Sequence, residues 1–151
     1  MRLFLLVITT LFFGAQAQAQ SVGDCDWQAS AQALVEPWEE NSRTFSNGKT
    51  RLALLDVIEP AAGAFHILIL SPPYDELGGR QCRSIGMSPG IGFFGADFGG
   101  LEASYDPSVG LMFAMPVQVY EPDTGLGRAA RLYFSVNQAT GQIKSRLQGG
   151  G

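Results

Sequence analysis

Three turn segments of similar composition punctuate the second half of the chain and constrain its fold more than any other feature. In each, a polar residue stands four positions ahead of a glycine, and the glycines, Gly110, Gly125 and Gly141, are 15 and 16 residues apart. This spacing suits a type I turn followed by a left-handed glycine, which closes a short β-hairpin. The pattern therefore predicts consecutive antiparallel strands, that is, a meander.

The segments around these turns alternate apolar and polar residues, as half-buried strands do. Leu132 and Phe134 share one face, and Tyr133 lies on the other. In the final segment Lys144 and Arg146 alternate with apolar residues, and basic side chains on an edge strand deter pairing with another chain. The predicted strands are Leu111–Tyr120, Arg128–Val136 and, at the edge of the sheet, Ile143–Leu147.

A further hairpin is predicted in the first half of the chain. Ser46-Asn47-Gly48 separates the segments Ser42–Phe45 and Lys49–Ile58, and Asn-Gly is a strong hairpin signal because both residues tolerate positive φ. The next segment, Phe65–Leu70, is apolar without regard to face. Strands of that kind are usually central and covered on both sides, so we expect this one in the middle of a sheet.

One helix is predicted, between Asp26 and Trp38. Its apolar residues, Trp27 and Leu34 among them, recur at steps of 4, 3, 1 and 3, and Pro37 would end it. Aromatic side chains at helical spacing mostly pack in a core. We therefore expect both tryptophans to be buried where this helix covers one face of the central strands.

These elements predict a mainly β fold on the border of the α+β class: an antiparallel meander sheet or sandwich of about seven to nine strands with one short N-terminal helix. The chain has 151 residues, of which 46% are apolar, and this suits one domain with a sizeable core. We place the domain at residues 20–147 and expect a flexible glycine-rich tail at 148–151.

Residues 1–19 have the layout of a cleaved secretory signal peptide. A short basic start precedes the apolar stretch Leu3–Gly14, and Ala15–Ala19 contains two overlapping small-x-small cleavage sites, between which the sequence does not decide. About 12 apolar residues are too few for the roughly 20 that span a bilayer. We therefore predict export, to the periplasm in a Gram-negative bacterium and otherwise by secretion, with no stable membrane insertion after cleavage.

The two cysteines, Cys25 and Cys82, are expected to pair. An exported chain enters an oxidising compartment, where disulfides form and persist. Neither cysteine has another cysteine or the histidine close by in sequence, as a zinc site would need. We therefore predict a structural disulfide and no metal site.

The balance of charge disfavours two classes of partner. The chain has 10 basic and 14 acidic side chains, a net charge of −4, and only two of the basic residues are lysines. Nucleic acids and anionic lipid surfaces are bound mainly through clustered Lys and Arg. We predict no nucleic-acid partner, which leaves an unknown protein or small molecule as the partner.

The segment Gly90–Gly95 matches the dinucleotide-binding pattern G-x-G-x-x-G, but its context does not fit. That pattern works by placing a pyrophosphate at the N-terminus of a helix. The residues that follow, Ala96–Gly100, cannot continue as a helix. We predict no cofactor and interpret the segment as a glycine-rich strand and loop in which missing side chains allow close packing.

His66 is the only histidine, so any histidine-dependent mechanism must use it. A catalytic role would need a carboxylate such as Asp56 to orient the ring and an accessible nucleophile, and no serine lies in a nucleophile-elbow motif. A histidine in an apolar strand is more often a packed residue with one nitrogen hydrogen-bonded. We assign no catalytic residue and keep His66 and Asp56 as the candidates.

The longest predicted surface connection is Ser71–Arg80, in which Pro-Pro-Tyr stiffens the chain and presents an aromatic side chain. Surface loops carry function disproportionately often. Tyr74, Arg80 and Arg83 are therefore the predicted contact residues, and Cys82 would tether this loop to the N-terminal helix.

Three functional hypotheses follow. The first is an exported small noncatalytic binding or accessory module for an unknown ligand, because the sequence holds no convergent catalytic chemistry. The second is a small exported hydrolase or isomerase that uses His66 with a carboxylate, and the third is an envelope-associated structural or oligomerising protein. The position of His66 distinguishes the first two hypotheses, because a place beside a carboxylate in an open pocket would favour the enzyme.

Overall fold

The computed structural model describes residues 20–149. The predicted signal peptide at 1–19 and residues 150–151 of the predicted tail lie outside the described residues. The strands are β1 (Ser21–Asp24), β2 (Ser42–Phe45), β3 (Thr50–Asp56), β4 (Phe65–Tyr74), β5 (Arg80–Gly86), β6 (Gly95–Ala96), β7 (Glu102–Asp106), β8 (Gly110–Glu121), β9 (Leu126–Val136) and β10 (Ile143–Gly149). The helical segments are the 3₁₀ turns η1 (Trp27–Ala29), η2 (Ala31–Ala33) and η3 (Ala61–Gly63) and the short helix α1 (Trp38–Asn41).

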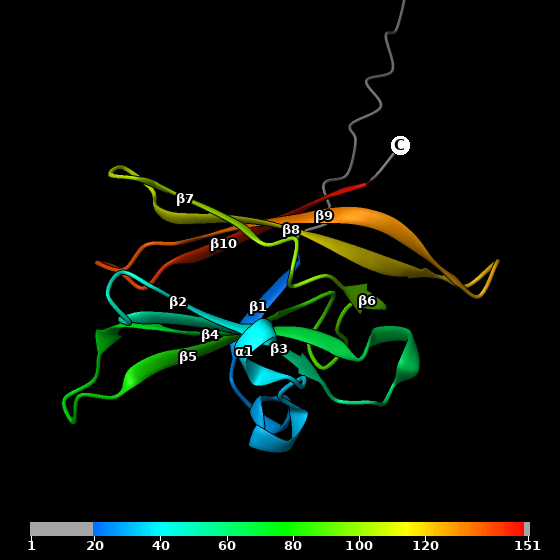
Figure 1. Ribbon diagram of the computed structural model, residues 1–151, viewed down its shortest axis with the longest axis horizontal. Coiled ribbons are helices and arrows are strands. Elements are labelled where there is room, and N and C mark those ends of the chain that lie inside the picture. The colour runs from blue at the N-terminus through cyan, green and yellow to red at the C-terminus, as the bar shows by residue number, and fades with distance from the viewer. Residues whose placement is uncertain (1–19, 150–151) are drawn as a thin grey trace, which may run out of the picture.

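Two antiparallel five-stranded sheets stack face to face as a sandwich (Figure 1). The lower sheet has the order β1-β5-β4-β3-β2. The upper sheet has the order β10-β9-β8-β6, and β7 also pairs with β8. The prediction of a mainly β fold is confirmed, with about ten strands in place of seven to nine.

The predicted turns and meander are confirmed in the upper sheet. Gly110, Gly125 and Gly141 have φ of +110°, +71° and +76°, the left-handed conformation that glycine adopts without steric cost. Strands β8, β9 and β10 follow one another as antiparallel neighbours, and β10 is an edge strand. It continues to Gly149, where it still pairs with Ala130, so its end lies beyond the expected boundary at 147.

The first-half hairpin is also confirmed, and the next strand is longer than predicted. Ser46, Asn47 and Gly48 all have positive φ between β2 and β3. Strands β3 and β4 lie inside the lower sheet, and for β4 this is the central position that the apolar composition of Phe65–Leu70 predicted. Because β4 runs on to Tyr74, the connection to β5 is only Asp75–Gly79.

The hydrophobic core fills the space between the sheets. Phe113 of β8 lies at its centre, where its ring stacks on Phe134 and meets the edge of Phe45 from the lower sheet, with centroid separations of 4.9 Å in both pairs. Pairs of this geometry stabilise a core beyond the area that they bury. The fully buried aliphatic and methionine side chains of this core are Leu52, Ile67, Ile69, Ile85, Met115, Leu132 and Val136.

The glycine-rich segment after β5 packs against β4 as a loop. Phe93 is fully buried, and its backbone exchanges hydrogen bonds with Phe65 at 2.7 and 3.0 Å. A Cβ at Gly92 would lie 2.2 Å from the carbonyl oxygen of Phe65. Glycine at this position therefore permits close backbone approach, and no helix follows it up to residue 149.

The predicted helix between Asp26 and Trp38 is wrong. Two 3₁₀ turns occupy the first part of the segment, and α1 begins only at Trp38. The reason is a tertiary contact: Val35 donates its backbone N–H to the carbonyl oxygen of Leu54 at 3.1 Å, which removes a donor that a helix would use. Trp27 and Trp38 are 55% and 54% exposed, so the expectation that they are buried is also wrong.

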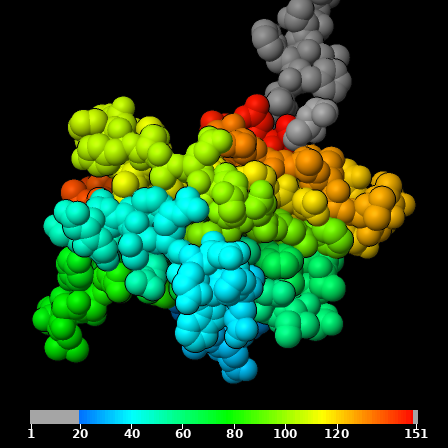
Figure 2. All heavy atoms as spheres, in the orientation of Figure 1, coloured from blue at the N-terminus to red at the C-terminus, as the bar shows by residue number. Residues whose placement is uncertain are grey.

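The Cys25–Cys82 disulfide is confirmed and holds the N-terminal segment to the lower sheet. Cys82 lies on β5, and the backbone N–H of Cys25 also donates to its carbonyl oxygen at 3.3 Å. Figure 2 shows the N-terminal segment, in blue, protruding beneath the lower sheet. The disulfide thus fixes this segment on the outer face of the sheet, where the candidate site is found.

Candidate functional site

A cavity of about 230 Å³ lies between the outer face of the lower sheet and the N-terminal segment. Its floor is formed by β1, β5 and β4, of which β1 and β5 carry small residues and β4 carries His66. Ser21 pairs with Gly86, and Gly23 pairs with Ser84. Because these four positions lack bulky side chains, the floor leaves room that a typical strand face would fill.

Gly86 is essential to the shape of this floor. A Cβ there would lie 2.6 Å from the carbonyl oxygen of Ile91 and 3.0 Å from Nδ1 of His66. The Ile91 oxygen accepts hydrogen bonds from the backbone N–H groups of Met87 and Ser88, which curls the loop after β5 back over the strand. The chain therefore needs glycine at this position to bring the loop and the histidine together.

His66 is the most deeply buried titratable group in the cavity. Its side chain is 2% exposed, and Nε2 has no hydrogen-bond partner among the described residues. Burial lowers the pKa of the imidazole below its ordinary value, because desolvation disfavours the charged form. The ring is therefore neutral at neutral pH and offers one lone pair and one N–H group.

Gln28 of η1 closes the cavity from the N-terminal segment. Its Nε2 donates to Oγ of Ser84 at 2.9 Å, and its Oε1 is buried with no partner in residues 20–149. Gln28 and His66 both line the cavity. Two nearly fully buried side chains that line one cavity thus carry unpaired polar atoms, which is costly unless a bound molecule satisfies them.

The rim of the cavity carries one aromatic and two acidic side chains. Trp27 is half exposed. Asp24 pairs with Arg83 at 2.6 Å, whereas Asp26 forms no ion pair within the described part of the chain. The cavity therefore combines a neutral polar interior with an aromatic and acidic rim.

The structure does not bring the two catalytic candidates into one site. Asp56 accepts a hydrogen bond from the backbone N–H of Ile58 at 2.8 Å and lines a different hollow, beside Trp27 and Ser30. The carboxylates in the His66 cavity belong to Asp24 and Asp26. Among residues 20–149, no three His, Cys, Asp or Glu side chains gather in a way that could hold a metal ion.

The three predicted contact residues divide between two places. Tyr74 pairs with Arg80 across β4 and β5, and Arg80 donates to the carbonyl oxygen of Gly48 at 3.3 Å. Arg83 lies further along β5, where it pairs with Asp24 at the rim of the His66 cavity. The half-exposed ring of Tyr74 and the exposed Arg80 side chain therefore form a surface separate from Arg83.

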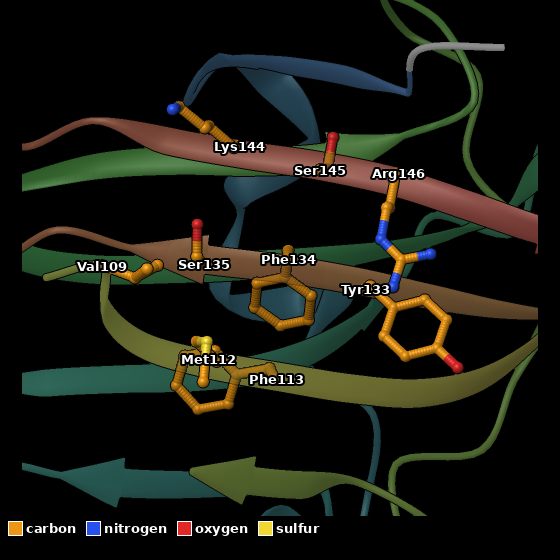
Figure 3. Close-up of a pocket in the computed structure, with 9 residues that line it drawn as sticks. All are labelled: Val109, Met112, Phe113, Tyr133, Phe134, Ser135, Lys144, Ser145 and Arg146. Carbon is orange, nitrogen blue, oxygen red and sulfur yellow. The ribbon is translucent and has the colours of Figure 1, made fainter. Parts of the chain in front are cut away.

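A second hollow, of about 270 Å³, lies on the outer face of the upper sheet (Figure 3). Figure 3 shows Arg146 reaching from β10 to the ring of Tyr133, with its guanidinium carbon 3.9 Å from the ring centroid. Arg131 is paired with Glu102 at 2.8 Å. The aromatic face is thus already covered, and no unpartnered buried polar atom of the described residues lines this hollow.

Comparison with family models, with curated proteins and with solved structures finds no match for this chain. The cavity is therefore interpreted from its own geometry.

Sequence reasoning missed Gln28, Ser84 and Gly86. A signal was present in the alternation of small residues, Ser21 with Gly23 and Ser84 with Gly86, which leaves one strand face bare. It could not be used without knowing that β1 pairs with β5, because those segments are more than 50 residues apart.

Proposed function

We propose that the protein is an exported noncatalytic binding module that takes a small ligand in the His66 cavity. The observation that carries the proposal is that two side chains lining one polar cavity, those of His66 and Gln28, each hold a buried, unpartnered atom, Nε2 and Oε1. Buried polar groups in folded proteins are nearly always hydrogen-bonded. A ligand that offers a matching donor or acceptor gains those hydrogen bonds without creating new unpaired groups.

Two observations support export. The disulfide between Cys25 and Cys82 is of the kind that persists in oxidising compartments. The apolar segment at 1–19 predicts a signal peptide, although it lies outside the described residues. In residues 20–149, no helix has the length and apolar character that crossing a membrane requires.

The arrangement around His66 favours binding over catalysis. An imidazole that acts as a general base is oriented by a carboxylate or a comparable partner and lies within hydrogen-bond reach of a nucleophile. Neither Asp24 nor Asp26, the carboxylates that line the cavity, forms a hydrogen bond or ion pair with His66 within residues 20–149. Asp56 is engaged with Ile58 outside the cavity, and Oγ of Ser84 accepts its hydrogen bond from Gln28. The polar groups here are thus arranged to hold a molecule.

Titration followed by NMR tests the proposal. Because His66 is the only histidine, the ring proton signals of the chain report on this cavity without further assignment. Glucose, glycine, citrate and choline serve as four small polar molecules that differ in charge. We expect at least one of them to shift the His66 signals saturably, together with the indole N–H signal of Trp27.

Gly86→Val disrupts the cavity, because a Cβ there would collide with the carbonyl oxygen of Ile91 and displace the loop beside His66. We expect this variant to lose the saturable shift. Ser88→Ala, at the exposed end of the cavity, is the milder second variant and should retain folding and weaken binding. The proposal is overturned if none of the four molecules shifts either signal in the wild-type protein.

A further inference from the structure

We propose that the ligand of the His66 cavity is a small organic cation: an ammonium compound that also carries a hydrogen-bond donor. This inference rests on the proposed binding function and deepens it by naming the class of ligand. It follows from the charges that line the cavity, from the exposed aromatic face at its rim and from the unpaired acceptor in its interior.

The charged side chains that line the cavity are both acidic. They are Asp24 and Asp26, and no Lys or Arg of the described residues lines it. Arg83 offsets the charge of Asp24 through their ion pair at 2.6 Å. Asp26 keeps its charge without an ion pair in residues 20–149, so it is the carboxylate that would attract a cation and repel an anion.

Trp27 follows Asp26 directly and is 55% exposed at the same rim. Its exposed indole ring is therefore open to contact with a ligand at the rim. Tryptophan is the best cation–π partner, and quaternary ammonium groups are recognised by such rings. A carboxylate and an indole on adjacent residues of the rim are thus two groups that favour a positive charge.

The interior provides an acceptor for a donor group on the ligand. Oε1 of Gln28 is buried and unpartnered, and its Nε2 is already committed to Ser84 at 2.9 Å. This oxygen is covered in the free protein, so a ligand hydroxyl or N–H group reaches and satisfies it when the Gln28 side chain turns toward the cavity. The cavity volume of about 230 Å³ lies below the roughly 300–1,000 Å³ of sites for drug-sized molecules, so the ligand must be small.

A matched pair of molecules tests the inference. Choline carries a quaternary ammonium and a hydroxyl, and 3,3-dimethylbutan-1-ol has the same shape with carbon in place of the charged nitrogen. Both are titrated into the full protein, with the His66 and Trp27 signals as the readout. We expect the Kd of choline to be about tenfold lower than that of 3,3-dimethylbutan-1-ol, because only choline gains the cation–π and carboxylate attractions.

Two rim variants locate the source of that preference. Asp26→Asn removes the charge at an exposed position whose side chain makes no hydrogen bond in the cap of η1, so the fold should be retained. We expect it to bring the two affinities within about threefold of each other. Trp27→Leu should weaken choline more than its neutral isostere. Asp123→Asn, in the exposed β8–β9 turn, makes the same change of net charge away from the cavity and should alter neither affinity.

The outcomes separate the two proposals. Equal affinity for choline and its isostere, or shifts caused only by glucose, would overturn the cation inference and leave the binding function standing. A shift caused by citrate alone would overturn it in the same way. If none of these molecules shifts the His66 or Trp27 signals, both proposals are overturned.

Discussion

The disulfide is expected to contribute a large part of the stability of this domain. Cys25 and Cys82 are 57 residues apart in sequence, so their bond closes a long loop in the unfolded chain. In the chain-entropy description, a loop of this length raises the free energy of unfolding by about 4 kcal/mol. A domain of this size has a total of only about 5–15 kcal/mol, so the loss would be severe.

The perturbation is the double variant Cys25→Ala/Cys82→Ala, which removes the bond without leaving a free thiol. Urea unfolding followed by far-UV circular dichroism gives the free energy of unfolding and its dependence on urea. We expect a loss of about 4 kcal/mol and a fall in Tm of roughly 15 °C. The slope with urea should rise, because the open chain exposes more surface when it unfolds.

A reduced wild-type sample is the matched control. With a reductant present, the wild-type protein should unfold at the same urea concentration as the double variant, and the reductant should leave the variant unchanged. A loss below about 1 kcal/mol with an unchanged slope would refute the loop-entropy reasoning. It would mean that the bond only tethers the N-terminal segment locally to an otherwise intact sandwich.

Three further perturbations test the core, the turns and the buried histidine. Leu132→Ala should lower the free energy of unfolding by about 2–5 kcal/mol in urea titrations, because Leu132 is fully buried between the sheets. A loss below about 1 kcal/mol would contradict that packing. Gly110→Ala should lower the free energy of unfolding clearly more than Gly125→Ala in the same assay. Both glycines have positive φ, but of the two only Gly110 is crowded, because a Cβ there would lie 2.3 Å from the carbonyl oxygen of Val136. Equal losses of stability in the two variants would contradict this account. Burial lowers the pKa of His66, so below about pH 6.5 the unfolded chain binds more protons than the folded chain. The free energy of unfolding therefore decreases as the pH is lowered through this range, by at most about 1.4 kcal/mol per pH unit. His66→Gln should show a smaller fall between about pH 7.5 and 5.5 in urea titrations, and parallel curves for the two proteins would exclude this account.

The upper sheet could be predicted from the sequence because local rules determine it. Glycines that need positive φ mark its turns, and the alternation around Leu132 and Phe134 assigns the face that is buried. Successive strands joined by short turns become antiparallel neighbours, so sequence order is also spatial order. The predicted boundaries agree with β8 and β9 to within two residues.

The N-terminal segment could not be predicted because a long-range contact overrides its local pattern. The periodic apolar residues between Trp27 and Trp38 favour a helix in isolation. In the folded chain, Leu34 bridges to Leu55 and the disulfide holds Cys25 on β5, so the segment follows the sheet in short turns. These contacts take the backbone hydrogen bonds that a helix would have used, and they leave the tryptophans at the surface.

The mainly β class, the positions of the turns and the pairing of the two cysteines could be predicted from local sequence patterns and residue counts. His66 also stood out, as the one histidine in an apolar strand. The surroundings of that histidine, in contrast, depend on the tertiary structure. Gly86, Ser84 and Gln28 lie 18 or more residues from His66 along the chain, and strand pairing with one disulfide brings them around one cavity. A binding site depends on convergence in space, and the physical interactions that produce this convergence are non-local.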